Sequence, residues 1–407
     1  MEDFDSFSKL HLNLLNQINY DYKNNSTIVI DLVTVMGAIY CTDVHTPKTN
    51  DKPRYIEMTI PVFNYHIWSK VTHLIENLAK WVSEDTFKVN FQETNFEPSS
   101  YTNSLLPPYP NDVTLFSGGL DSFAGAYHNY INGISSDYVG FINKGEEKTN
   151  QEKVAKFYKE IFIDTTEIIL IEKPFKKKKF FIQSTRSLLY LALAIAKSYF
   201  NSSQDVYLYE NGILSLNPEI KNRYTTKTTH PKTIYLYRQL LEELNISIRV
   251  NHPFMFRTKG EIINDMDRRF KENINNTFTC GQGRAHPDRK HSGQCGICIP
   301  CLLRKISLSA YDNEEFDVTY EYSYGTKIKD VQEEVYRKDY ASNLDYFNYY
   351  YDLIKTKRTH LEIHTRDKYY RGDSNFRFNN NEMFVRFSEE YERFMKKYAP
   401  NRYSCTY

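Results

Sequence analysis

The sequence of 407 residues predicts an α/β protein with a doubly wound parallel sheet. Between residue 109 and about residue 310, short apolar runs alternate with stretches of helical periodicity, as is typical of parallel sheets covered by helices. A glycine-containing turn follows the first apolar run, and four cysteines close the region. The flanking segments lack the alternation. We therefore expect an N-terminal α+β extension over residues 1–108, a central domain over residues 109–310 and a helical C-terminal extension over residues 311–407.

The N-terminal extension combines β-rich runs with one amphipathic helix. Thr27–Ile39 and Tyr55–Val62 are rich in β-branched residues and predict strands, as does the alternating segment Thr86–Gln92. Apolar residues recur at helical spacing through His66–Val82 and predict a helix there. The stiff, proline-rich connector Leu106–Pro110 marks the expected boundary with the central domain.

The central domain is expected to contain five strands and three principal helices, with ligands at the carboxyl ends of the strands. The strands are expected at Val113–Phe116, Asp137–Ile142, Glu167–Ile171, Val206–Tyr209 and Ile246–Val250, and the helices near residues 147–161, 183–200 and 230–244. After residue 311 the pattern is helical and rich in tyrosine, as in Glu334–Thr356 and Glu382–Tyr398.

Composition indicates a globular protein of the cytoplasm. Hydrophobic residues make up 41% of the chain. No apolar run approaches the roughly 20 residues of a membrane helix, and the acidic start has no secretory hydrophobic segment. A net charge of +1 provides no strong basic field, so nucleic acid is not the expected partner.

The most informative segment is a glycine turn that follows the run Val113–Phe116. Its residues are Ser117, Gly118, Gly119, Leu120, Asp121 and Ser122. A strand, two glycines and an apolar helix aim backbone N–H groups at one point, which is how proteins hold phosphate. Ser117 and Ser122 add hydroxyl donors, and Asp121 is placed to cap the helix or to hold Mg²⁺. The alternative is an ordinary strand–turn–helix corner.

A cysteine cluster lies downstream and consists of Cys280, Cys295, Cys298 and Cys301. Four thiolates at this spacing suit a tetrahedral Zn²⁺, which has no open position and would be structural. An iron–sulfur cluster is the alternative, because C-x2-C-x2-C also occurs in ferredoxins, although the fourth cysteine here lies upstream.

Together these motifs resemble the 7-cyano-7-deazaguanine synthases, a family of N-type ATP pyrophosphatases with a PP-loop fold. Ser117–Ser122 matches the family's pyrophosphate loop SGGxDS, and Gln183–Leu191 is similar to its R-N-x-x-F-L helix start. Thr277–Cys280 and Cys295–Arg304 resemble its zinc segment, T-x-S-C followed by C-G-x-C-x-x-C-x-x-R. The motifs come in the family's order. The resemblance implies nucleotide binding by Ser117–Ser122 and Arg186, with ATP, Mg²⁺ and Zn²⁺ as cofactors.

The departures from that family are informative. Fourteen residues separate Cys280 from Cys295 and include five basic or imidazole side chains: Arg284, His286, Arg289, Lys290 and His291. Ser187 stands where the family has Asn, and the D-C-R-P segment of its base pocket is missing. Both long extensions are also absent from the biosynthetic enzyme. A chain of this kind resembles the synthase-like components of bacterial anti-phage defence operons such as the Qat system.

Individual residues in the central domain are candidates for specific roles. Arg186 starts a helix and matches the family arginine, so it is expected to contact phosphate in catalysis, together with Asp121. Lys144 follows the second strand and is a further candidate phosphate partner. Glu210 and Asn211 follow a strand directly and are candidates for substrate binding, with a helix or turn cap as the alternative.

For three further features we prefer a structural interpretation. Lys176–Lys179 is typical of a solvated loop. His230 precedes Pro231 and is expected to cap a helix, and His252, before Pro253, ends a strand.

The expected activity is ATP-dependent adenylation of a 7-deazaguanine carboxylate, followed by formation of a carbon–nitrogen bond. The extensions imply a protein partner, or a protein amine as acceptor. Two alternatives stay open. One is a thiouridylase-like enzyme that adenylates a tRNA base, and the other is a nucleotide-binding scaffold subunit.

Overall fold

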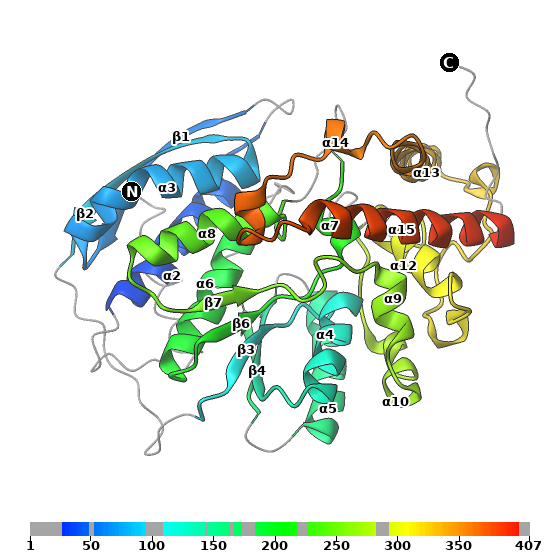
Figure 1. Ribbon diagram of the computed structural model, residues 1–407, viewed down its shortest axis with the longest axis horizontal. Helices are drawn as coiled ribbons and strands as arrows, with labels where there is room; N and C mark the ends of the chain where they lie inside the picture. Colours follow the sequence, from blue (N-terminus) through cyan, green and yellow to red (C-terminus); the bar gives the residue numbers. More distant parts are fainter. Residues whose placement is uncertain are drawn as a thin grey trace.

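The computed structural model describes residues 27–48, 53–94, 109–142, 145–162, 166–172, 184–218, 227–281 and 293–398. In the described part of the chain, a five-stranded sheet carries helices on both faces, a smaller sheet lies at one end and C-terminal helices lie at the other (Figure 1).

The central sheet is entirely parallel. Its strands are β3 (Asp112–Leu115), β4 (Ser136–Ile142), β5 (Ile168–Glu172), β6 (Asp205–Tyr207) and β7 (Arg249–Asn251). Their order is β5-β4-β3-β6-β7, so the chain reverses its direction of winding between β3 and β6. The α/β class and the parallel sheet are therefore confirmed. In such sheets the crevice at the reversal is where ligands bind.

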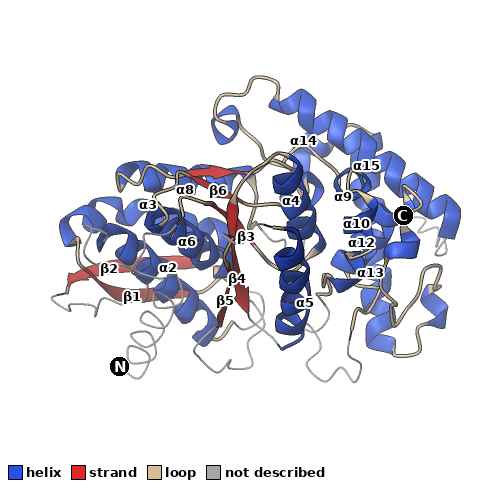
Figure 2. Cartoon of the chain, turned by 90° about the horizontal axis from the view of Figure 1, so that it is seen from below, coloured by secondary structure: helices blue, strands red, loops and turns tan. Residues whose placement is uncertain are grey.

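Helices cover the two faces of the central sheet (Figure 2). α4 (Leu120–Ile131) and α5 (Gly145–Ile161) lie on one face, and α6 (Arg186–Phe200) and α8 (Pro231–Glu243) lie on the other. All seven residues of β4 are buried, as expected for a strand covered on both sides. The three predicted helices of this domain are confirmed within a few residues.

The strand expected at Thr27–Ile39 is wrong, because these residues begin a helix, α2 (Thr27–His45). Their β-branched residues favour a strand locally, but the helix is buried on nearly all sides and packs along α6. Its two acidic residues are paired: Asp31 accepts from the N–H groups of Phe63 and Asn64, and Asp43 accepts from Thr185.

α2 also bears on the expectation that no apolar run is long enough to form a membrane helix. Among the described residues it is the one helix long and apolar enough to cross a membrane, yet 83% of the relevant window is buried inside the protein. Burial of this extent is typical of a core helix.

The rest of the described part of the N-terminal extension forms a β–α–β unit. β1 (Tyr55–Val62) pairs in parallel with β2 (Thr86–Glu93), and α3 (Tyr65–Ser83) connects them. α3 contacts α8 of the central domain, and one hydrophobic core runs from α2 and α3 through α6, α8 and the central sheet. Most of the connector Leu106–Pro110 lies outside the described residues, so the boundary there stays a prediction.

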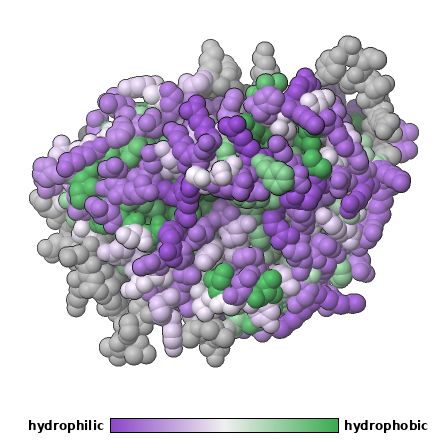
Figure 3. All heavy atoms as spheres, viewed as in Figure 1, coloured by the Kyte–Doolittle hydropathy of each residue, from purple (hydrophilic) through white to green (hydrophobic). Residues whose placement is uncertain are grey.

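The C-terminal extension is helical, as predicted, and packs around the cysteine cluster. Its main helices are α13 (Glu334–Lys355) and α15 (Phe376–Tyr398), which share a core with α12 (Ile299–Ser309). The remaining elements are α7 (Gly212–Ser215), α9 (Lys259–Asn264), α10 (Arg268–Lys271), α14 (Thr359–Glu362) and four 3₁₀ turns, Ile274–Asn276, Glu314–Phe316, Ile328–Asp330 and Asp367–Tyr370. The face of the molecule in Figure 3 is mostly hydrophilic, with small separate hydrophobic areas.

Candidate functional site

The glycine turn connects β3 to α4 and packs closely against α5. Gly118 has a φ of 73°, and a Cβ at this position would lie 2.6 Å from Cγ of Gln151 on α5. The Gln151 amide donates to the carbonyl oxygen of Ser117 at 3.1 Å. Gly118 is therefore required both for the left-handed backbone and for the approach of α5.

The serines of the turn are already organised by hydrogen bonds. Ser117 Oγ accepts from the N–H of Gly119 at 3.1 Å and lies 3.0 Å from Ser122 Oγ. Ser122 Oγ donates to the carbonyl oxygen of Gly119 at 3.0 Å. No side chain from the described part of the chain caps α4, so its first N–H groups and its positive end are available to an anion.

The structure brings Asn211 and Glu210 to the same place as the glycine turn. Asn211 Nδ2 donates to Asp121 Oδ1 at 3.1 Å and to Glu210 Oε1 at 3.0 Å. Asn211 also caps α7, since its Oδ1 accepts from the N–H of Leu214 at 3.0 Å. These contacts lie beyond the carboxyl ends of β3 and β6, so residues 90 positions apart meet where the chain reverses its winding.

Lys259 completes this group and is not predicted from the sequence. Its side chain is buried and its Nζ forms an ion pair with Asp121 Oδ2. The two residues are 138 positions apart, so no local pattern connects them. The only sequence signal is the capping box of α9, in which Thr258 and Glu261 fix the helix start immediately around Lys259.

The surroundings of Glu210 favour the protonated, uncharged form of its carboxyl group. Burial, and then the nearby charge of Asp121, raise the pKa of Glu210 well above its ordinary value. His252 donates from Nε2 to the carbonyl oxygen of Glu210 at 2.8 Å, and its buried Nδ1 has no partner among the described residues. Burial lowers the pKa of His252 to about 4, so this imidazole is neutral at physiological pH.

Arg186 lies at the start of α6 and pairs with α5, the helix that packs against the glycine turn. Its Nη1 is 3.8 Å from Oε2 of Glu147, which lies one helical turn before Gln151. Arg186 is thus placed on the side of α5 that faces the turn. Lys144, Lys176–Lys179 and the five basic or imidazole residues between Cys280 and Cys295 lie outside the described residues, so their roles stay predictions.

The N-terminal extension holds the residue that precedes Arg186. Asp43 of α2 accepts from the hydroxyl of Thr185 at 2.7 Å and from its N–H at 3.2 Å. Arg54 forms ion pairs with both Asp43 and Asp85 and so ties this contact to the start of β2. The extension therefore fixes the start of α6.

The C-terminal extension similarly holds Thr258, the residue that precedes Lys259. The hydroxyl of Thr258 donates to Glu390 Oε1 of α15, while Glu390 Oε2 is buried without a partner among the described residues. Burial raises the pKa of Glu390 to about 8. Both extensions thus anchor residues adjacent in sequence to a cation of the candidate site.

The four cysteines of the cluster meet in one buried place. Their sulfur atoms all lie within 4.8 Å of one another, with 3.9 Å between Cys295 and Cys301 and 4.0 Å between Cys280 and Cys298. Tetrahedral Zn²⁺ with bonds of about 2.3 Å requires sulfur separations of about 3.8 Å. The four thiol groups therefore fit Zn²⁺ with only small movements.

The segment before Cys280 connects the cysteine cluster to the glycine turn. The N–H of Phe278 donates to the carbonyl oxygen of Gly118 at 3.0 Å. The neighbouring Thr277 and Thr279 both accept from the buried guanidinium of Arg304, which also pairs with Asp317 at 2.8 Å. A metal held by the cluster would thus fix one wall of the turn.

His230 caps α8, as predicted: its Nδ1 accepts from the N–H of Lys232 at 3.1 Å.

Comparison with known proteins does not assign a family or a function to this site. Neither the models of protein families nor the curated protein sequences contain a match to this chain.

Proposed function

We propose that this chain is an ATP-dependent ligase that adenylates the carboxylate of a 7-deazaguanine and then forms a carbon–nitrogen bond. The observation that carries the proposal is the meeting of Asp121, Asn211 and Lys259 where the winding reverses between β3 and β6. The sequence motifs supply the reaction class, since the glycine turn and the cysteine cluster resemble those of the 7-cyano-7-deazaguanine synthases in a PP-loop fold.

The carboxylate of the proposed substrate is a poor electrophile and must first be activated. A carboxylate repels nucleophiles and has no good leaving group, whereas an acyl-adenylate loses AMP readily. The carboxylate oxygen attacks the α-phosphorus of ATP, the bond to the β-phosphate breaks, and pyrophosphate leaves. The site must therefore hold the triphosphate in line with the carboxylate and neutralise the charge that develops on the leaving group.

The residues of the site fit these tasks. The hydroxyls of Ser117 and Ser122 and the first N–H groups of α4 would bind the leaving pyrophosphate. Arg186 and Lys259 would supply positive charge to the phosphates. Mg²⁺ held by Asp121 would screen the phosphates. Glu210 would bind the base, since a neutral carboxyl group can donate one hydrogen bond and accept another. Asn211, expected to bind the base as well, is fully buried and would instead hold Glu210 in place through its amide.

Zn²⁺ in the cysteine cluster would be structural. Four thiolates leave no position for a substrate, and the cluster supports the turn through Phe278.

The nucleophile is proposed to be an amine of a partner protein, in a cytoplasmic anti-phage defence system. Both extensions are integrated into the core and brace the site, so they offer surfaces that a small biosynthetic enzyme does not need.

Product analysis tests the proposal. We expect AMP and pyrophosphate only when 7-carboxy-7-deazaguanine and ATP are both present, and we expect mass spectrometry to detect the base on a protein amine. Consumption of ATP that depends on tRNA instead would support a thiouridylase. Absence of AMP with every acceptor would support a scaffold subunit.

A further inference from the structure

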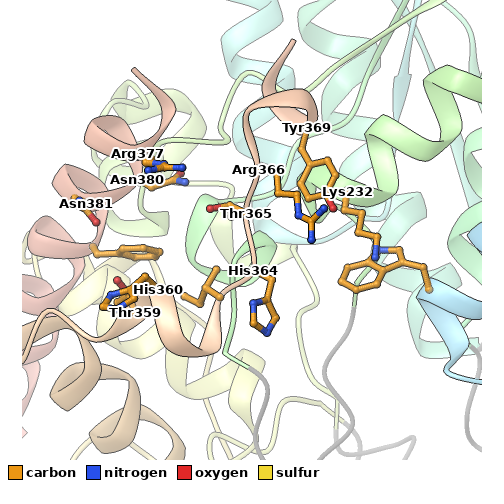
Figure 4. Close-up of a pocket in the computed structure, with 13 residues that line it drawn as sticks. Lys232, Thr359, His360, His364, Thr365, Arg366, Tyr369, Arg377, Asn380 and Asn381 are labelled. Carbon is orange, nitrogen blue, oxygen red and sulfur yellow. The ribbon is translucent and has the colours of Figure 1, made fainter. Parts of the chain in front are cut away.

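A cavity lies away from the glycine turn and has no assigned role. It has a volume of about 650 Å³ and opens between α3, the start of α8 and the segment from α14 to α15 (Figure 4). We call it the basic cavity. Its size suits a small organic ligand. None of its described lining residues belongs to the glycine turn or to the group around Asp121.

Charge is the first property that defines the basic cavity. Its described lining contains Lys232, Arg366 and Arg377 with two histidines, His360 and His364, and it contains no acidic side chain. Lys232 lies in the first turn of α8, where the helix dipole adds to the positive potential. Cations that line one cavity repel one another, so this arrangement favours an anionic ligand.

A buried hydrogen-bond acceptor is the second property. Asn380 is only 5% exposed and lines the cavity from α15. Its Nδ2 donates to the hydroxyl of Tyr370 at 3.0 Å, whereas its Oδ1 has no partner among the described residues. A buried acceptor without a donor is costly, so a ligand that brings an N–H group would be favoured here.

Flat apolar walls are the third property. Trp81, Tyr369 and Phe384 line the cavity. The Trp81 ring is held in place, since its Nε1 donates to Thr233 Oγ1 at 2.9 Å and Lys232 Nζ lies 3.8 Å from the ring centre. These walls suit a planar ring.

We propose that the basic cavity binds a nucleoside phosphate, separately from the glycine turn. Figure 4 shows Lys232 and Arg366 on one side of the cavity and Asn380 with Arg377 on the other. The phosphate would lie against Lys232 and Arg366, and the base would donate an N–H to Asn380. Inorganic phosphate lacks the planar group that the aromatic walls accommodate, and an acidic peptide lacks a base.

The two tryptophans of the chain provide a direct assay. Trp68 is fully buried in the N-terminal core and Trp81 lines the cavity, so ligand in the cavity changes the fluorescence of Trp81. We expect AMP or GMP to quench wild-type fluorescence in a saturable way, and Trp81→Phe to remove the response. Arg366→Ala should weaken binding at least about tenfold, a loss of about 1.4 kcal/mol. The matched control Arg268→Ala, exposed on α10, should bind normally.

Separation from the glycine turn is tested with Ser117→Ala, which should leave the Trp81 response intact. The proposal is overturned if neither nucleotide quenches Trp81 at millimolar concentration, or if Arg366→Ala binds like the wild type. It is also overturned if inorganic phosphate or a glutamate peptide gives the same response at lower concentration, or if Ser117→Ala abolishes the response. Because the readout is binding alone, these outcomes do not depend on the ligase activity.

Discussion

At Asp121, a single carboxylate serves two neighbours. It accepts from Asn211, pairs with the buried Lys259 and lies in the first turn of α4. Truncating Asp121 would leave the charge of Lys259 buried without its partner, which costs stability as well as activity. Ser117 is different, because its side chain is exposed and its loss leaves no buried charge.

Ser117→Ala therefore separates catalysis from folding. We expect the rate of AMP formation to fall about a hundredfold, or about 3 kcal/mol of barrier, with no change in Tm. Ser69→Ala, an exposed serine on α3, is the matched control and should retain full activity. Equal rates for both variants would mean that the glycine turn is only a structural corner.

At the scale of elements, the hydrogen bonds from Thr185 to Asp43 of α2 fix the start of α6. Thr185→Ala removes the hydroxyl that donates to the buried Asp43, which we expect to cost about 1–3 kcal/mol of stability and to slow AMP formation by displacing Arg186. Thr185→Ser keeps the hydroxyl and should restore both properties. If Thr185→Ala is less stable but forms AMP at the normal rate, the contact with α2 does not position Arg186.

The junction of α15 and α9 should produce a specific pH dependence. The folded protein keeps a proton on Glu390 up to about pH 8, whereas the ordinary pKa is about 4.5. The stability that this proton contributes is full below about pH 4.5. It is lost as the pH rises toward about 8, by about 1.4 kcal/mol per pH unit.

Glu390→Gln is neutral throughout and removes that dependence. Denaturant unfolding of both proteins between about pH 5.5 and 7.5 should show the free energy of unfolding of the wild type falling relative to the variant. The nearby charged residues Glu261 and Arg393 are present in both proteins, so the difference between the two curves reports on Glu390. Parallel curves would contradict a protonated Glu390.

At the scale of the whole molecule, the cysteine cluster should support the glycine turn. We expect about one Zn²⁺ per chain, and we expect its removal by a chelator to lower Tm and AMP formation together, because Phe278 contacts Gly118. Cys298→Ser should reproduce both effects. Cys41→Ser, a buried cysteine of α2 outside the cluster, is the control. Bound iron, or a metal-free protein of unchanged stability, would contradict this account.

The sequence predicts β3, β4 and β5 well because each coincides with a short apolar run. β7 (Arg249–Asn251) overlaps the predicted strand Ile246–Val250 at only two residues, because Val250 is its one apolar residue. The sequence prediction fails at Thr27–Ile39, where β-branched residues favour a strand and only the packing along α6 selects a helix. Likewise, the glycine turn and the four cysteines are visible as local spacing. Local spacing does not predict the roles of Lys259, Gln151 and Asp43, because each residue acquires its role from a contact made by the tertiary fold.

The central claim is that the site between the carboxyl ends of β3 and β6 activates a carboxylate with ATP. ATP–pyrophosphate exchange tests it most directly, because labelled pyrophosphate enters ATP only if adenylation occurs and reverses. We predict exchange that requires 7-carboxy-7-deazaguanine and is reduced about a hundredfold in Ser117→Ala. Exchange that is absent with this substrate, or unchanged in Ser117→Ala, would contradict the account.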